Sequence, residues 1–136
     1  MALIEMTVLG PPISHQCKDP AVLKKWKATV LAAALPLWAG KPLLTGRLKC
    51  TIMNFHEGSK PTCDDDNMVK PIRDALNGQI YQDDKQITYS ETIQISINAP
   101  VQIRRGSPVL LHAYGIGDEF LYLRLDDAPA YIQLPG

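Results

Sequence analysis

The sequence predicts a single α/β or α+β domain in which helices pack on a mixed β-sheet. Segments of alternating apolar and polar residues, typical of strands, alternate along the chain with segments that place apolar residues at helical spacing. The length of 136 residues fits one domain, 1–136, and the apolar fraction of 46% is ordinary for a folded protein. The predicted order of elements is β-α-β-α-β-α-β.

The first half of the chain contains two predicted strands and one helix. Residues 3–9 alternate, and this strand ends at Gly10-Pro11-Pro12 because proline cannot donate to a β-ladder. A helix over about 20–35 follows, since Asp19 and Pro20 are typical of an N-cap and a first helical position. Its apolar stripe includes Trp26, which is therefore predicted to lie in the core. Residues 47–55 alternate again and predict the second strand.

The second half repeats this alternation twice. A helix over 67–77 is predicted to end at Gly78 in the left-handed conformation, and residues 86–98 are predicted to form a strand. Ser107-Pro108 begins a third predicted helix over 109–114, which Gly115 or Gly117 ends. A last strand is expected over 120–125 and an irregular tail from residue 126.

Targeting and disulfide signals are weak. The N-terminus lacks the basic start and cleavage site of a signal peptide, and the longest apolar run, 28–40, is interrupted by Pro36 and is too short for a bilayer span. The three cysteines show no CxxC spacing, which argues against a disulfide framework or a zinc knuckle, and the three histidines are expected on the surface or in loops. We therefore expect a cytoplasmic protein with no membrane partner.

Charge is distributed unevenly although the net charge is zero. Residues 1–60 carry eight Lys and Arg against three acids, a net charge of +5, and residues 61–136 carry six against eleven, a net charge of −5. Five of those eleven acids lie in two clusters, Asp64-Asp65-Asp66 and Asp83-Asp84. Cations bound at these clusters would make the local charge positive, so the region could bind phosphates. The alternative is a solvated charge asymmetry that has no partner.

The aspartate clusters carry the main chemical signal. In an extended approach to the helix, Asp64 and Asp66 would face one side and Asp65 the other. Carboxylates this close repel each other unless a hard cation such as Mg²⁺ lies between them. Lys70, one helical turn after Asp66, would project over the same region and hold phosphate oxygens. The alternative is that Asp65 or Asp66 merely caps the helix, although a single cap does not account for both clusters.

Fixed residues at fixed gaps across 60–87 resemble a known family. Lys60-Pro61, Asp64-x-Asp66-Asn67, Lys70, Asp74-Ala75-Leu76-Asn77-Gly78 and Asp83-Asp84-x-Gln86-Ile87 resemble the RusA family of Holliday-junction resolvases. A weaker likeness extends over most of the chain. The resemblance implies a homodimeric, Mg²⁺-dependent endodeoxyribonuclease of bacterial or phage origin that makes paired nicks in four-way DNA junctions during recombination and repair. Mn²⁺ is a possible substitute, and no small organic cofactor is expected.

The resemblance also implies roles for individual residues. The metal-site aspartates fall on Asp64, Asp66 and Asp84, and the functional lysine falls on Lys70. Supporting positions fall on Asn67, Asp74 and Asp83. The basic residues that could contact the DNA backbone are Lys24, Lys25, Lys27, Lys60, Arg73, Lys85, Arg104 and Arg105. Family members often carry several basic residues just before the first aspartate, and this chain has only His56 and Lys60 there.

The position of Asp84 raises a question of geometry. A helix over 67–77 is about 16 Å long, so Asp84 starts far from Asp66. Residues 78–83 are just able to span the return at about 3.3 Å each. Otherwise a second subunit must help to order Asp84, and on this ground metal binding is predicted to depend on dimerisation. 

Three other functions fit parts of the pattern. They are a DNA- or junction-binding protein that does not cut, a metal-dependent phosphohydrolase of nucleotides, and an interaction domain with surface aspartates. The first differs from a nuclease in that Mg²⁺ or Mn²⁺ would not start junction cleavage. The second would prefer nucleotides to junction DNA, and the third would bind no metal ion.

Overall fold

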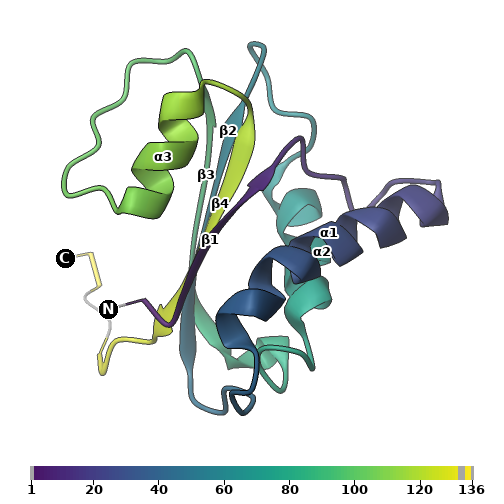
Figure 1. The fold of residues 1–136 in the computed structure, drawn as a ribbon, viewed down its shortest axis with the longest axis vertical. Helices are drawn as coiled ribbons and strands as arrows, with labels where there is room; N and C mark the ends of the chain where they lie inside the picture. Colours follow the sequence, from purple (N-terminus) through teal and green to yellow (C-terminus); the bar gives the residue numbers. More distant parts are fainter. Residues whose placement is uncertain (1, 132–133, 136) are drawn as a thin grey trace.

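Four strands and three helices alternate along the chain in the computed structural model, which describes residues 2–131 and 134–135 (Figure 1). In chain order the elements are β1 (Ile4–Leu9), α1 (Pro20–Trp38), β2 (Leu48–His56), α2 (Asp65–Leu76), a 3₁₀ turn (Asp84–Gln86), β3 (Ile87–Ser96), α3 (Pro108–Ile116) and β4 (Phe120–Asp127). The predicted order and the α+β class are confirmed. None of the described helices is long and apolar enough to cross a membrane.

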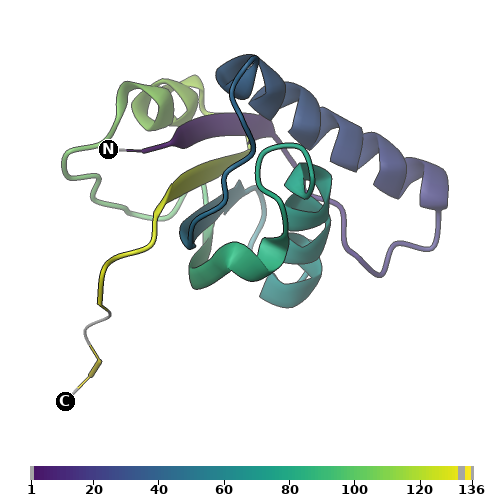
Figure 2. The ribbon, with the colours of Figure 1, turned by 90° about the horizontal axis from the view of Figure 1, so that it is seen from below.

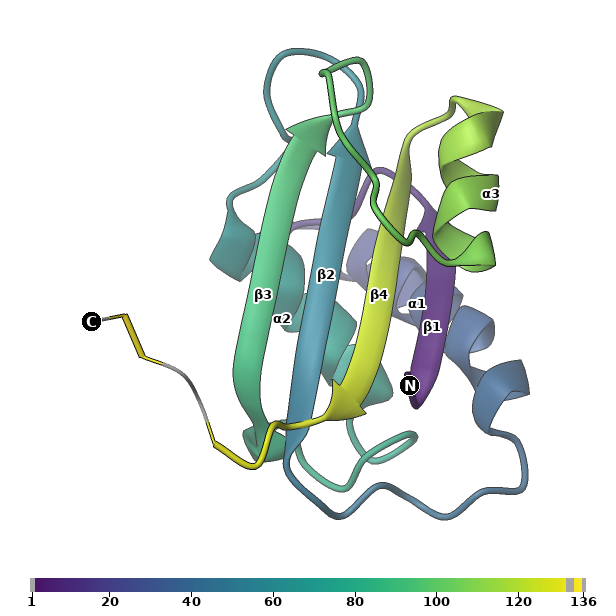
Figure 3. The ribbon, with the colours of Figure 1, turned by 90° about the vertical axis from the view of Figure 1, so that its left-hand side faces the viewer.

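The strands form one mixed sheet in the order β1-β4-β2-β3 (Figure 3). Strand β4 is antiparallel to both β1 and β2, while β2 and β3 are parallel, with Asn54 opposite Gln94. A parallel pair needs a crossover connection, and α2 provides it. The crossover leaves β3 at the edge of the sheet with α2 lying across it.

The main core lies between the sheet and the two helices on one of its faces. Helices α1 and α2 cover this face, and α3 lies on the opposite one (Figures 1 and 2). Trp26 of α1 is buried, as predicted, and so are Val30 of α1 and Met68 and Ile72 of α2. They meet the inward side chains of the sheet, which include Ile4, Met6, Cys50, Ile52, Leu121, Leu123 and Leu125. This core fixes α2 against the sheet.

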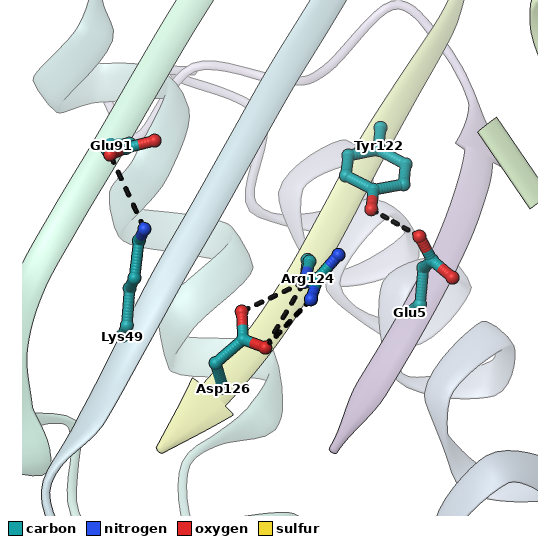
Figure 4. A network of polar contacts seen from close by, with 6 residues as sticks. All are labelled: Glu5, Lys49, Glu91, Tyr122, Arg124 and Asp126. Carbon is teal, nitrogen blue, oxygen red and sulfur yellow. Dashed lines mark hydrogen bonds and ion pairs between the residues drawn. The ribbon is translucent and has the colours of Figure 1, made fainter. Parts of the chain in front are cut away.

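Helix α3 covers only part of the other face. Phe55, Ala113, Phe120 and Tyr122 form a smaller core there, and Phe55 stacks on Phe120 with 4.6 Å between the ring centroids. The rest of this face carries polar pairs, shown in Figure 4. These are Lys49 with Glu91 at 3.5 Å, Arg124 with Asp126 at 2.9 Å, and the Tyr122 hydroxyl, which donates to Glu5.

The element boundaries follow the predicted start and stop residues in most places. The Asp19 carboxylate accepts from the backbone N–H of Ala21 at the start of α1, and Gly117 ends α3 at φ 85°. Three predictions need correction. Helix α1 continues to Trp38, β4 reaches Asp127 where an irregular tail was expected, and His56 at the end of β2 is buried.

Candidate functional site

Helix α2 begins two residues earlier than its sequence pattern predicts, and this changes the setting of the first aspartate cluster. Asp64 is the N-cap residue, with extended backbone angles of φ −75° and ψ 169°, and Asp65 and Asp66 belong to the first turn. The prediction that Asp65 or Asp66 is the cap is therefore wrong. Asp64 does not cap the helix with its side chain, because its Oδ1 accepts from Nδ2 of Asn67 at 2.7 Å.

The earlier start of the helix also corrects the predicted directions of these side chains. Alternation applies to an extended segment, and Asp65 and Asp66 are helical. Asp65 and Asp66 both line a groove beside α2, whereas Asp64 lies outside the groove lining. Asp65 and Asp66 lie in the first turn of α2, where the partial positive charge of the helix N-terminus stabilises carboxylates.

The groove runs between α2 and the edge strand β3 and has a volume of about 570 Å³. It brings together Asp66, Asp84 and Lys70, which the sequence assigned to one site. Its lining consists of Asp65, Asp66, Val69, Lys70, Arg73, Asp84, Ser90 and Thr92. Sequence reasoning missed Ser90 and Thr92. The signal that could have found them is the period of two along β3, which places polar residues 90, 92 and 94 on the side that faces α2.

Asp84 reaches this groove within a single chain. Gly78 takes the left-handed conformation at φ 76°, as predicted, and its N–H donates to the carbonyl of Tyr81 at 2.8 Å. The hydroxyl of Tyr81 then donates back to the carbonyl of Arg73 at 2.6 Å. The segment therefore folds back along α2, and the expectation that a second subunit must help to place Asp84 loses its basis.

The 3₁₀ turn that carries Asp84 is itself capped. The Asp83 carboxylate accepts from the N–H of Lys85 at 2.9 Å, and the Gln86 side chain accepts from the N–H of Asp83, which completes a capping box. The hydrogen bond from Lys85 N–H lowers the pKa of Asp83. Asp83 therefore supports the turn, consistent with the supporting position that it was given.

Lys70 is one of two basic residues in the groove lining. Its Nζ donates to Oδ1 of Asp74 at 2.8 Å, one helical turn further on, and about half of its side chain is exposed. This hydrogen bond and the charge of Asp74 raise the pKa of Lys70, and the charge of Asp84 adds to the shift. Lys70 is thus a protonated and accessible cation, as phosphate binding requires.

Arg73 is held against the sheet at the groove. Its guanidinium donates to the Ser90 hydroxyl and also interacts with the thiol of Cys50. Burial raises the pKa of Cys50 to about 11, and Arg73 opposes that rise. Of the eight predicted DNA contacts, Arg73 alone lines the groove. Arg104 and Arg105 border a separate cavity on the α3 face, and Lys24, Lys25 and Lys27 lie on α1.

The donor atoms of the groove fit a hard divalent cation. Asp65, Asp66 and Asp84 offer carboxylate oxygens, and Ser90 and Thr92 offer hydroxyls. Within residues 2–131 and 134–135, however, no three Asp, Glu, His or Cys side chains form a ready-made metal site. Mg²⁺ in nucleic-acid enzymes is commonly held by one or two carboxylates together with waters and substrate phosphates. These residues therefore fit a metal site in which the protein supplies one or two carboxylates and a substrate phosphate supplies further ligands.

Comparison with known proteins assigns the chain to a family. The family model of the endodeoxyribonuclease RusA matches residues 13–104, about two thirds of the chain, and this range contains all of the groove. No curated protein matches the chain. The matched family consists of nucleases that resolve DNA junctions, so the chain is an enzyme that binds branched DNA. The protein belongs to the RusA family of endodeoxyribonucleases, the Holliday-junction resolvases.

Proposed function

We propose that the protein resolves four-way DNA junctions by Mg²⁺-dependent paired nicks, with the metal held by Asp64, Asp66 and Asp84. The observation that carries this proposal is that Asp66 and Asp84, from opposite ends of the motif region, line one groove together with Lys70. The grouping of two carboxylates and an accessible cation suits a scissile phosphate, whose oxygens need both a metal and a positive side chain.

The three aspartates have distinct settings within this proposal. Asp66 projects from the first turn of α2, and Asp84 comes from the capped 3₁₀ turn before β3. Asp64 lies outside the groove lining, and its carboxylate is exposed and bonded to the side chain of Asn67. For Asp64 to bind the metal with Asp66 and Asp84, its side chain has to rotate away from Asn67. When bound, Mg²⁺ would supply a Lewis acid and an activated water.

Lys70 and Arg73 supply the positive charge on the helix side of the groove. Lys70 holds phosphate oxygens, and its hydrogen bond to Asp74 restrains its side chain and raises its pKa. Arg73 is half-buried and tethered to Ser90, so it contributes a fixed charge rather than a mobile contact. The exposed bases Lys60, Lys85, Arg104 and Arg105, with the lysines of α1, extend the contact to the DNA backbone.

Paired nicking follows from a homodimer. A twofold axis places two identical grooves against two strands of like polarity in a four-way junction. Because Asp66 and Asp84 share a groove within one chain, each subunit carries a complete set of these acids. The dimer is therefore needed for two nicks per junction rather than for assembly of the metal site.

The test is cleavage of defined DNA substrates. The purified protein is incubated with a four-way junction, linear duplex and single-stranded DNA, with Mg²⁺, with Mn²⁺ or with EDTA. We expect symmetric junction cleavage that needs the metal, loss of cleavage without loss of junction binding in Asp66→Asn, and normal cleavage in Asp118→Asn, a matched change at an exposed acid outside the groove. Junction binding without cleavage in every metal would support a binding protein that does not cut.

A further inference from the structure

Gln94 connects the sheet to the turn that carries the first aspartate cluster. Its Nε2 donates to the backbone carbonyl of Cys63 at 3.0 Å and to Oδ1 of Asp65 at 2.8 Å. Its Oε1 accepts from Nδ2 of Asn54 at 3.0 Å. All three bonds come from one amide, so its orientation is fixed at both ends.

The sheet places these two amides side by side. Asn54 of β2 and Gln94 of β3 are direct partners in the parallel register, and β3 is the strand nearest α2 at the edge of the sheet (Figure 3). Asn54 is fully buried, and it is directed toward the same side as Cys50 and Ile52, which belong to the core beneath α1 and α2. The Cys63 carbonyl and the Asp65 carboxylate can only accept, so they require the NH₂ end of the Gln94 amide, and the buried Asn54 holds its oxygen end.

We propose that Gln94, held at its oxygen end by Asn54, is a positioning residue for the metal site, and that Asp65 is its anchor rather than a metal ligand. This inference rests on the proposed function. The two groups that Gln94 grips, the Cys63 carbonyl and the Asp65 carboxylate, lie immediately before and after Asp64 and just ahead of Asp66. Holding them fixes the backbone from which both proposed ligands project.

The polar pair has a cost that a purely structural contact would avoid. Oδ1 of Asn54 is buried and has no hydrogen-bond partner within the described part of the chain. Burial of an unpaired acceptor is unfavourable, and two apolar side chains would fill the same space without it. The Asn54–Gln94 pair is therefore better explained by what it holds than by the stability it adds. In other metal sites too, hydrogen bonds to metal-binding carboxylates serve to orient the carboxylates.

Asp65 is distinguished from its neighbours by this contact. One of its oxygens is occupied by Gln94, whereas the carboxylate of Asp64 is bonded only to the side chain of Asn67 among the described contacts. An anchor needs a hydrogen-bond acceptor but no charge. A ligand for Mg²⁺ needs the charge. Asparagine at position 65 keeps the first property and removes the second, so it separates the two roles.

The test measures binding of Mn²⁺ alone by the loss of its free electron-paramagnetic-resonance signal. Gln94→Met removes all three hydrogen bonds at nearly constant length and is expected to weaken Mn²⁺ binding about tenfold, the usual effect of losing a partner of a metal-binding carboxylate. The matched control is Gln79→Met, an exposed glutamine beyond the far end of α2, which should bind Mn²⁺ as the wild type does.

Three further variants test whether Gln94 acts through Asp65. Asp65→Asn should keep wild-type Mn²⁺ affinity within about threefold, and Asp65→Ala should lose as much as Gln94→Met. The double variant Gln94→Met with Asp65→Ala should be no worse than either single one, because the two changes break the same contact. Junction cleavage by Gln94→Met should recover at raised Mg²⁺, with the rate at saturating metal restored.

The outcomes separate this inference from the function on which it rests. If the wild type binds Mn²⁺ and cleaves junctions, but Gln94→Met binds Mn²⁺ normally or Asp65→Asn loses binding as Asp66→Asn does, the positioning role is wrong and the nuclease proposal stands. If the wild type binds no Mn²⁺, either alone or with junction DNA, both fail. Should Gln94→Met not fold, ¹⁵N spectra of the wild type decide: the Gln94 side-chain amide signal should shift on addition of Mg²⁺, and an unmoved signal refutes the role.

Discussion

The ammonium of Lys70 lies 2.8 Å from the carboxylate of Asp74, one turn along α2, on the helix that carries Asp66 into the groove. Lys70 lines the groove together with Asp65, Asp66 and Asp84, whereas Asp74 lies outside the groove lining. The arrangement gives Lys70 a role that is separable from the fold, because its side chain is about half exposed.

Replacement of Lys70 is expected to affect chemistry and not folding. Lys70→Met should reduce the single-turnover rate of junction cleavage about 100-fold, the usual effect of removing one group that stabilises developing charge. Junction affinity and the unfolding midpoint should stay near wild type. Lys41→Met, at an exposed lysine in the loop after α1, serves as the control. A comparable loss of rate in both variants would argue against the assigned role.

The Lys70–Asp74 pair also makes a prediction about pH. Asp74 first, and then Asp84, raise the pKa of Lys70 above its ordinary value of 10.5. The stabilisation from the pair is therefore fully present below pH 10.5 and is lost as the pH rises through the raised pKa. Asp74→Asn should bring this pKa down toward 10.5, as followed by NMR of the Lys70 side chain. An unchanged pKa would show that Asp74 does not interact with Lys70 in solution.

Tyr81 is expected to stabilise the segment that returns Asp84 to the groove. Its buried hydroxyl donates to the Arg73 carbonyl, and burial raises the pKa of Tyr81, so the group stays a donor. Tyr81→Phe should lower the free energy of unfolding in urea by about 1 kcal/mol and raise the Mg²⁺ concentration for half-maximal cleavage. Tyr131→Phe, at a tyrosine that is 86% exposed, should change neither. Equal stability of both variants would contradict the proposed role.

Mixed dimers test whether each active site is formed by the residues of a single subunit. If the protein forms the proposed homodimer, mixing wild type with an excess of Asp66→Asn gives mixed dimers with one intact groove each, because Asp66 and Asp84 come from the same chain. A supercoiled cruciform plasmid should then be nicked once and accumulate as open circles instead of being linearised. Complete loss of nicking in mixed dimers would mean that each site needs residues from both subunits, as the helix length alone suggested.

The sequence was sufficient for the order of elements and for most of their ends. Alternation and helical spacing located the four described strands and the three α-helices but not the 3₁₀ turn. Asp19, Ser107 and Gly78 marked ends that the structure confirms, and of Gly115 and Gly117 it is Gly117 that ends α3. The position of β4 between β1 and β2 could not be predicted, because pairing between strands depends on contacts that periodicity does not encode. The early start of α2 was missed because aspartates favour both cap and first-turn positions.

The sequence predicted which residues would lie together at the candidate site better than it predicted how they are arranged. Asp66, Lys70 and Asp84 line one groove, as their grouping required, whereas Asp65 takes the place in the lining that was expected for Asp64. Asp65 replaces Asp64 in the lining because α2 begins at Asp65, and the alternation of an extended segment does not apply to helical residues. The contact of Gln94 with Asp65 joins residues that are far apart in the chain, so no local pattern indicates it.

The most direct test of the groove as a metal site is the anomalous scattering of Mn²⁺ in crystals of the protein with junction DNA whose scissile phosphates are replaced by phosphorothioates. We predict a peak in the groove of each subunit, within bonding distance of carboxylate oxygens of Asp66 and Asp84 or of a DNA phosphate beside them, and no such peak in Asp66→Asn. Mn²⁺ bound only elsewhere on the protein, with junction cleavage intact, would contradict the assignment.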